Sequence, residues 1–244
     1  MAVHITRIGL TPLKGARHAA LTQVQLDRRG PVGDRVFCLV DVDRARVLRT
    51  VEHPRMVLVD ARWDGSSLAV CTPDAGSVTG APEPTGETLV SDYWGRDARL
   101  EIMDSPHAEV IARHLGREVR LARVGRPGEV VYGAPVSIVT TGALATLGEQ
   151  DSSRFRATFT ISADHDPEPG TVLALGDAVV RVRGAVPRCR VIDIAPASGL
   201  LDRTHLRTLA DQAHPSGELP FGVDAEVIVP GLVRSGQPVS VVPS

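Results

Sequence analysis

Short apolar stretches separated by closely spaced turn residues run along most of this chain, and this pattern constrains the fold more than any other feature. The segment 57–63 alternates apolar and polar side chains, and the segments 3–8, 21–26 and 36–42 are similar but less regular. Turn signals such as Asp64-Gly65 lie between them. Several short strands spaced in this way predict an antiparallel sheet or a barrel.

Helical patterns are few. The clearest covers 106–115, where Ser105 is the expected N-cap, Pro106 takes the first helical position and Gly116 follows the end. A buried strand over 136–140 is expected to lead into a short helix over 141–148 that Thr141 would cap. A strand that delivers a helix N-terminus in this way is a natural anion site.

The rest of the chain completes the outline. The segment 72–87 is rich in Gly, Pro, Thr and Ser, which predicts an exposed loop. Further expected elements are strands over 118–124, 157–162, 179–182, 224–229 and 239–242 and a helix over 202–212. The sequence therefore predicts an α+β, predominantly β chain with a few short helices, in two parts at 1–100 and 101–244.

Composition excludes several classes of protein. The 244 residues include 27 basic and 29 acidic side chains and 43% apolar residues, so a strongly basic nucleic-acid binder and an acidic disordered chain are both excluded. Arg7 interrupts the first apolar run, which argues against a secretory signal, and Pro135 lies in the longest uncharged stretch, 130–148, which argues against a membrane span. Three dispersed cysteines fit a reducing compartment. We therefore expect a cytoplasmic protein without a nucleic-acid or membrane partner.

The common catalytic motifs are missing. The chain has no Gly-rich dinucleotide or P-loop fingerprint, no GxSxG, no HExxH and no CxxC. Asp164-His165-Asp166 offers oxygen and nitrogen ligands, but it lies among Pro and Gly residues typical of a solvated loop. Metal binding there is a minor alternative.

Two residues carry a chemical signal of their own. Lys14 is the only Lys among 27 basic residues, and an ammonium group is a compact point charge that can reach a phosphate, whereas guanidinium is a planar fork. Cys189 lies between Arg188 and Arg190, and positive charge favours a thiolate that acts as a nucleophile or a soft-metal ligand. The simpler alternatives are an isolated surface Lys and an inert buried Cys on a strand.

Seven short segments, taken in order, resemble a known family. They are Leu10-Thr-Pro-Leu-Lys-Gly15, the run 33–41, Pro54-Arg-Met56, the run 138–147, the run 154–158, the run 186–199, and an ending with Phe221-Gly222, Pro230-Gly231 and Gly236-Gln-Pro-Val239. In this order they resemble the MOSC domain family, named for the C-terminal domain of molybdenum cofactor sulfurase. The resemblance is to its two-part form, which includes the mitochondrial amidoxime-reducing component and bacterial relatives.

The resemblance implies a pterin-based molybdenum cofactor in a cleft between an N-terminal β-barrel domain and a MOSC β-barrel domain. By position, Lys14, Arg35 and Arg156 would bind the phosphate and pterin, and Cys189 would ligate molybdenum with Arg188 beside it. Thr141 and Thr158 fall on further cofactor-contacting positions.

The chain also departs from the family pattern. Gly15, Thr158, Val186, Ile192 and Ala195 replace the Ser, Asn, Cys, Thr and Asp of the pattern. Asp193 lies on the same face of an expected strand as Ala195, but too far along it to replace the missing carboxylate.

Three functions are compatible with these residues. The first is a molybdenum-dependent oxidoreductase that reduces N-hydroxylated or N-oxide small molecules. Because the chain carries no haem, flavin or iron–sulfur motif, it would take electrons from a separate ferredoxin- or cytochrome-type protein. The second is a MOSC-fold enzyme repurposed for a molybdenum-independent reaction on an anionic small molecule of specialised metabolism. The third is a sulfur or cofactor carrier that works through Cys189.

Overall fold

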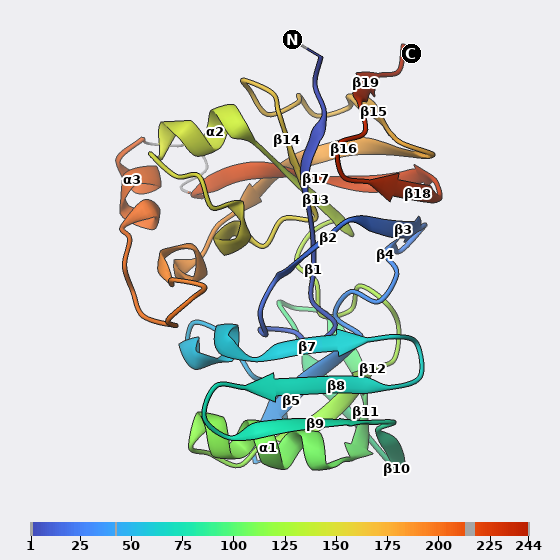
Figure 1. Ribbon diagram of the computed structural model, residues 1–244, viewed down its shortest axis with the longest axis vertical. Coiled ribbons are helices and arrows are strands. Elements are labelled where there is room, and N and C mark those ends of the chain that lie inside the picture. The colour runs from blue at the N-terminus through green and yellow to red at the C-terminus, as the bar shows by residue number, and fades with distance from the viewer. Residues whose placement is uncertain (1, 42, 213–217, 244) are drawn as a thin grey trace.

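Strands dominate the structure, a computed structural model that describes residues 2–41, 43–212 and 218–243. Among these residues the strands form four sheets, of eight, five, three and three strands. Figure 1 shows two parts stacked along the long axis of the molecule, with β13 to β19 in the upper part and β7 to β12 with α1 in the lower part. The chain is therefore predominantly β with a few short helices, as predicted.

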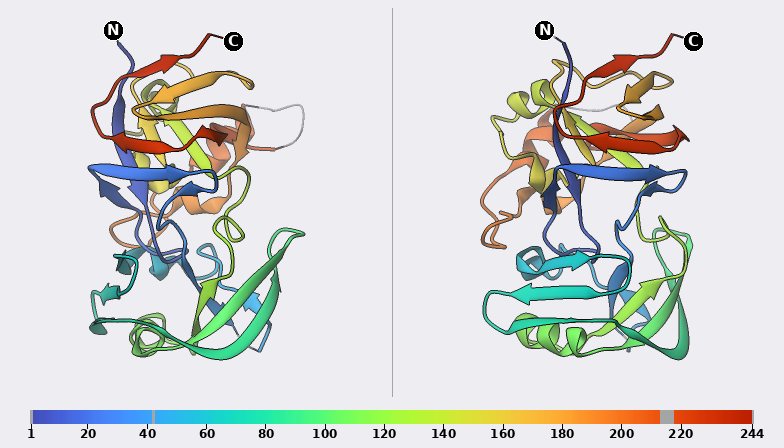
Figure 2. Two further views of the ribbon diagram at one scale, coloured as in Figure 1. Left: turned by 90° about the vertical axis from the view of Figure 1, so that its right-hand side faces the viewer. Right: turned by 45° about the vertical axis from the view of Figure 1, so that its right-hand side comes forward.

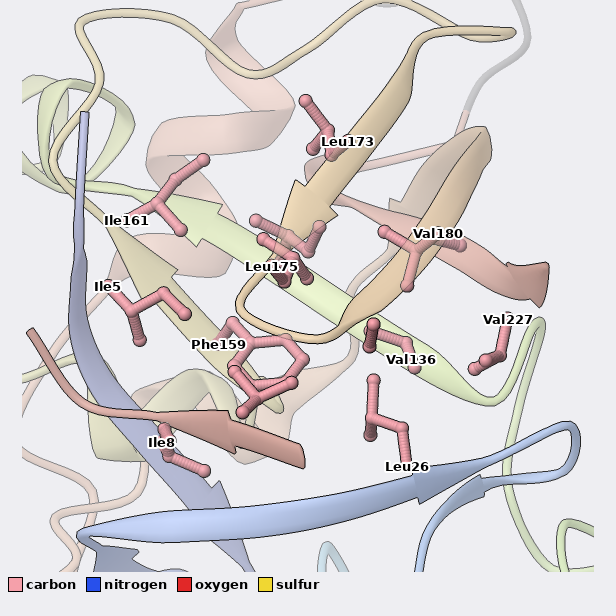
Figure 3. Close-up of a cluster of buried hydrophobic side chains, with 14 of the residues drawn as sticks. Ile5, Ile8, Leu26, Val136, Phe159, Ile161, Leu173, Leu175, Val180 and Val227 are labelled. Carbon is pink, nitrogen blue, oxygen red and sulfur yellow. The ribbon is translucent and has the colours of Figure 1, made fainter. Parts of the chain in front are cut away.

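The upper part is built on the eight-stranded sheet. Its order is β19 (Val239–Val241), β15 (Val172–Leu175), β16 (Ala178–Pro187), β17 (Pro220–Val229), β13 (Val136–Thr140), β14 (Phe159–Ile161), β1 (Ile5–Leu10) and β2 (Ala19–Leu21). Neighbours are antiparallel except for the parallel pair β13–β14. A three-stranded sheet of β18 (Gly231–Arg234), β3 (Gln23–Asp27) and β4 (Gly30–Pro31) packs beside it. Figure 3 shows their shared apolar core, which includes Ile8, Phe159 and Leu175.

The lower part joins two further sheets around a second core. One sheet is β10 (Glu83–Asp92), β11 (Asp97–Asp104), β12 (Arg120–Val124), β5 (Phe37–Asp41) and β6 (Arg46–Val47), and the other is β7 (Asp60–Trp63), β8 (Leu68–Thr72) and β9 (Gly76–Gly80). The helix α1 (Pro106–Leu115) packs against β8 and β9. Phe37, Met56 and Ile111 lie in the core between them.

The strands β1 to β4 belong in space with the second half of the chain, whereas Leu13 and Ala16 between them lie in the lower core. Ile5 to Ile8 of β1 pair with β14, and the whole of β18 pairs with β3. Conversely, α1 and β12 follow residue 100 but pack on sheets of the first half. The division of the chain at residue 100 stays a prediction about domains, while the two parts in space exchange these segments.

The expected helix at 106–115 is confirmed to the residue. The Ser105 hydroxyl accepts a hydrogen bond from the His107 amide, and Gly116 ends the helix at φ 68°. The third helix is shorter than expected: α3 covers His205–Asp211. No helix in the described part of the chain is long and apolar enough to cross a membrane.

Two strand predictions are corrected. The expected loop over 72–87 is wrong, because β9 and the first half of β10 lie there and pair with β8 and β11. Their side chains are small or polar and mostly exposed on both faces, so they lack the alternation that marks a half-buried strand. The expected strand over 57–63 begins only at Asp60, because Pro54 opens a 3-10 helix over Pro54–Leu58.

Candidate functional site

Three cations predicted for the site come from three separate segments. Lys14 follows β1, and its amide donates to the Phe37 carbonyl at 2.8 Å. Arg35 precedes β5, and Arg156 ends the 3-10 helix over Ser152–Phe155. Arg35 and Arg156 have φ values of 47° and 54°, a conformation that non-glycine residues seldom adopt. Such backbone strain is found most often at functional sites.

The pKa values show that these cations lie close together. Burial of the ammonium group, helped by the charges of Arg35 and Arg156 and opposed by Cys38 and Cys189, lowers the pKa of Lys14 from 10.5 to about 8. Burial lowers the pKa of Arg156 to about 9, and Arg35 and Arg7 act in the same direction. Although both residues are partly exposed along their stems, their charged ends are enclosed. The structure therefore brings Lys14, Arg35 and Arg156 into one cationic cleft.

The cleft has little negative charge of its own. The Asp34 carboxylate pairs with the Arg35 guanidinium and also accepts the Thr11 amide at 3.1 Å. Arg156 keeps one buried guanidinium nitrogen, Nη2, without a hydrogen-bond partner among the described residues. Because an unpartnered buried charge is costly, this nitrogen fits an external anion.

Cys189 supplies the exposed thiol of the site. It follows β16 and caps a 3-10 helix over Arg190–Asp193. Its charge affects the pKa values of Lys14, Arg156 and Arg188, so it lies beside the cationic cleft. Of the other two cysteines, Cys38 is buried, which raises its thiol pKa to about 12, and Cys71 is exposed on β8.

Arg188 holds the backbone that leads to Cys189. Its Nε donates to the Phe221 carbonyl at 2.7 Å and its Nη1 to the Phe155 carbonyl at 2.8 Å. Burial lowers the pKa of Arg188 to about 10, which Cys189 and Asp166 oppose. Its Nη2 has no partner in the described part of the chain.

The segment after Cys189 is not the strand expected from the sequence. It folds as a 3-10 helix that buries Ile192 in an apolar cluster with Phe155 and Phe221. Asp193 accepts the Leu206 amide at 3.1 Å and so supports the start of α3. Neither residue offers a polar group in place of the Thr and Asp of the family pattern.

The helix cap expected at Thr141 is wrong by one residue. The hydroxyl of Thr140 accepts the Ala143 amide at 3.2 Å, and Thr141 is the exposed first residue of α2 (Thr141–Thr146). The Gly142 amide donates to the Ala163 carbonyl at 2.9 Å. These first amides are therefore occupied inside the chain, and α2 does not present them to an anion.

Thr158 and Asp166 have structural partners. Thr158 and Ser137 exchange two hydrogen bonds of 3.2 Å between the amide of each and the hydroxyl of the other. Asp166 accepts the Thr140 hydroxyl at 2.9 Å and the Gly222 amide at 3.1 Å. No cluster of three metal-ligating side chains occurs in residues 2–41, 43–212 and 218–243.

Sequence reasoning missed His18 and Arg7. Burial and the charges of Arg156, Arg7 and Arg35 hold the pKa of His18 well below its ordinary value, so this side chain is neutral. The Arg7 guanidinium donates to the His18 carbonyl at 2.7 Å. Gly9 was the available signal: a Cβ there would lie 2.2 Å from both side chains, and glycine inside a strand often marks such a close approach.

A cavity of about 500 Å³ adjoins the cleft. Arg156 and His18 line one side of it and Ala195 another, whereas Lys14, Arg35 and Cys189 lie outside its lining. Its far side is a buried ion network in which the Glu149 carboxylate contacts Arg154 at 2.9 Å. We place the chemistry where Arg156, which lines this cavity and keeps an unpartnered Nη2, meets the exposed thiol of Cys189 and the other cations of the cleft.

Comparison with known proteins identifies the family. The model of the MOSC N-terminal beta barrel domain matches residues 2–101, and the model of the MOSC domain matches residues 94–240. A search of curated proteins finds no match to this chain.

The solved structures that this chain is similar to are distant from it in sequence. The YuaD protein from Bacillus subtilis is 13% identical with a TM-score of 0.42, over 99% of this chain and 96% of that one. A crystal structure titled as a hypothetical protein is 11% identical with a TM-score of 0.42, over 100% of this chain and 69% of that one. YiiM from Geobacillus stearothermophilus is 15% identical with a TM-score of 0.33, over 45% of this chain and 54% of that one. Because the two family models together match residues 2–240, the chain belongs to the MOSC domain family in its two-part form.

Proposed function

We propose that the cationic cleft binds a pterin-based molybdenum cofactor and that the protein is an oxidoreductase acting on N-hydroxylated or N-oxide small molecules. The observation that carries the proposal is the enclosed group of Lys14, Arg35 and Arg156 next to the exposed thiol of Cys189. Phosphate suits the cations, and a thiolate is a soft-metal ligand. The unpartnered Nη2 of Arg156 fits the same kind of ligand.

Each residue has a separate task in this proposal. Lys14 would hold the phosphate as a point charge, and Arg35 and Arg156 would bind the remaining polar groups and balance the negative charge. Cys189 would ligate the metal, and Arg188 would position it by holding the carbonyls of Phe155 and Phe221. When bound, the cofactor supplies the two-electron redox chemistry needed to remove oxygen from an N–O bond.

Electrons would come from a separate protein of the ferredoxin or cytochrome type, since the chain carries no redox motif of its own. The net positive charge of the cleft comes from Lys14, Arg35 and Arg156, since the His18 side chain is neutral. This charge would hold an anionic ligand while the metal changes oxidation state.

A molybdenum-independent reaction on another anionic small molecule is the second candidate. Ile192 is turned into the apolar core and Ala195 carries no polar side-chain atom. The backbone beyond Cys189 therefore lacks two hydrogen-bonding groups that the family pattern has there.

Metal and pterin content decide between the two candidates. The full chain is expressed in a host that makes the cofactor, and molybdenum is measured by elemental analysis with pterin fluorescence after oxidation. We expect near-stoichiometric molybdenum in the wild type and in Cys71→Ala, which removes the other exposed thiol, and loss of molybdenum in Cys189→Ala. A metal-free wild type, obtained beside a loaded control protein from the same host, would reject the first proposal in favour of the second.

A further inference from the structure

Two aromatic side chains are exposed at the junction of the two parts of the molecule. Trp94 lies at the tip of the β10–β11 hairpin and is 54% exposed, and Tyr132, in the segment between β12 and β13, is 46% exposed. Their ring centroids are 5.6 Å apart with an interplanar angle of 73°. The Arg49 guanidinium lies 5.2 Å from the Trp94 ring. Figure 2 shows the hairpin rising from the lower part toward the upper part.

The backbone holds Trp94 in an unfavourable conformation. Its φ of 57° is rare for a bulky residue and is set by the tight hairpin turn, in which Gly95 also has a positive φ of 74°. The Gly95 amide donates to the Asp92 carboxylate at 2.8 Å, and the Arg96 guanidinium donates to the Val131 carbonyl next to Tyr132. The hairpin tip and the segment carrying Tyr132 are thus tied together, so the two rings keep their relative position.

Tyr93 connects this pair to the cationic cleft. The Lys14 ammonium lies 5.2 Å from the centre of the Tyr93 ring. Burial raises the pKa of Tyr93, Arg35 and Arg96 lower it, and Cys189 raises it. Since Tyr93 contacts Lys14, its chain neighbour Trp94 lies next to the cationic cleft.

We propose that Trp94 and Tyr132 form an aromatic corner that selects substrates bearing a flat ring. The two rings contact each other edge to face, and their outer surfaces stay exposed, so a flat ring can stack on them or meet them edge-on, the arrangements that aromatic groups prefer. A ring held there would direct its polar N–O group toward Cys189 and the cations. This inference rests on the proposed function for the reaction, but the binding preference itself needs only the corner and the cleft.

The size of the corner favours a small molecule over a protein. A stable protein interface buries about 800 Å² on each partner. Two half-exposed rings supply a small part of that area, but it is enough for a ligand with one ring to stack against their exposed surfaces.

Equilibrium binding of two probes tests the proposal. Pyridine N-oxide carries a flat ring and trimethylamine N-oxide does not, although both carry the same N–O group. Calorimetric titration of the full chain is expected to show tighter binding of pyridine N-oxide. Trp94→Ala and Tyr132→Ala are each expected to weaken that binding by about threefold to tenfold and to leave trimethylamine N-oxide unchanged.

A spectroscopic control uses the only other tryptophan. Trp63 packs edge-on against Phe37 with centroids 5.0 Å apart in the lower core. In Trp63→Phe, Trp94 is the sole indole, and pyridine N-oxide is expected to change its fluorescence at the concentration found by calorimetry.

The proposal is overturned if the wild type does not prefer pyridine N-oxide, or if both probes lose affinity equally in Trp94→Ala. The variants could also keep the preference for pyridine N-oxide but lose reduction by an electron-donor protein. That result would assign the two rings to protein docking and would overturn the proposal. Molybdenum content separates this result from the proposed function. A metal-free protein that keeps the ring preference refutes only the redox proposal, and a loaded enzyme without the preference refutes only the corner.

Discussion

Replacing Lys14 by Met is expected to stabilise the unliganded protein while it weakens ligand binding. The ammonium group is enclosed, and none of the groups that dominate its pKa is a carboxylate. The Cys38 thiol next to it stays neutral, because burial raises its pKa to about 12. Met has a similar length and keeps the contact with the Tyr93 ring without the cost of an enclosed charge.

The size of the effect follows from the pKa of Lys14. A fall from 10.5 to about 8 corresponds to about 3 kcal/mol of destabilisation at pH 7, since one pKa unit is worth about 1.4 kcal/mol. Because the folded pKa is below the unfolded one, this penalty is fully present below pH 8 and disappears as the pH rises from 8 to 10.5. Lys14→Met is therefore expected to exceed the wild type in free energy of unfolding by up to about 3 kcal/mol at pH 7 and by about 1 kcal/mol at pH 10.

Urea denaturation of the two proteins at pH 7 and pH 10 measures both values. Arg62→Met is the matched control, since the Arg62 side chain is 82% exposed and its loss should change stability by no more than about 0.5 kcal/mol. Destabilisation of Lys14→Met at pH 7, or an advantage that stays the same at pH 10, would refute the reasoning, because it would mean that Lys14 has a structural partner.

Three further predictions concern stability and reactivity. Glu149→Gln should cost about 1–3 kcal/mol in urea denaturation, because it removes the carboxylate that Arg154 contacts at 2.9 Å and leaves Asp202 as the remaining partner of that arginine. Burial alone would raise the pKa of Glu149, but hydrogen bonds and arginine hold it at about 2, so its contribution should disappear as the pH falls from 4.5 toward 2. A neutral effect of the substitution would contradict this. A thiol reagent at pH 8 should label Cys71 and Cys189 in the folded protein and Cys38 only after unfolding, as mass spectrometry can verify; early labelling of Cys38 would disprove its burial. Ser105→Ala should lower stability by about 1 kcal/mol in thermal unfolding through loss of the helix cap, and an unchanged melting temperature would show that the cap is dispensable.

Features that depend only on residues nearby in the sequence were predictable. The helix α1 has its stop and start signals within its own segment, at Ser105 and Gly116, so the prediction agrees with the structure. The strands β9 and β10 were missed because their pairing partners, not their own side chains, define them. A similar limit explains the cap at Thr140, since two adjacent Thr residues give the same local signal.

The candidate site was predictable where composition is unusual. Lys14 is the only Lys, and the family resemblance placed Arg35, Arg156 and Cys189 near it. His18 and Arg7 were missed, because their approach to the cleft depends on the antiparallel pairing of β1 with β2 and on the lack of a side chain at Gly9.

One departure from the family pattern has a local structural reason. Gly15 has a φ of 88°, and a Cβ at this position would lie 2.4 Å from Cε of Met56. A Ser here would therefore require the end of the Met56 side chain to move and would be strained by the positive φ.

The exchange of β1 and β3 into the upper part also determines the order in which the chain can acquire structure during synthesis. β1 meets β2 early, but its other edge pairs with β14, and Ile161 is made more than 150 residues after Ile5. At the usual rate of elongation this takes about 8–30 s. For that time one edge of β1 keeps its amides and carbonyls unpaired, and such an edge can aggregate or recruit chaperones. The strands of the lower part lie mostly within residues 37–124, so this part can fold first. The ribosome-bound chain is most prone to aggregation until the partners of the upper part have been made.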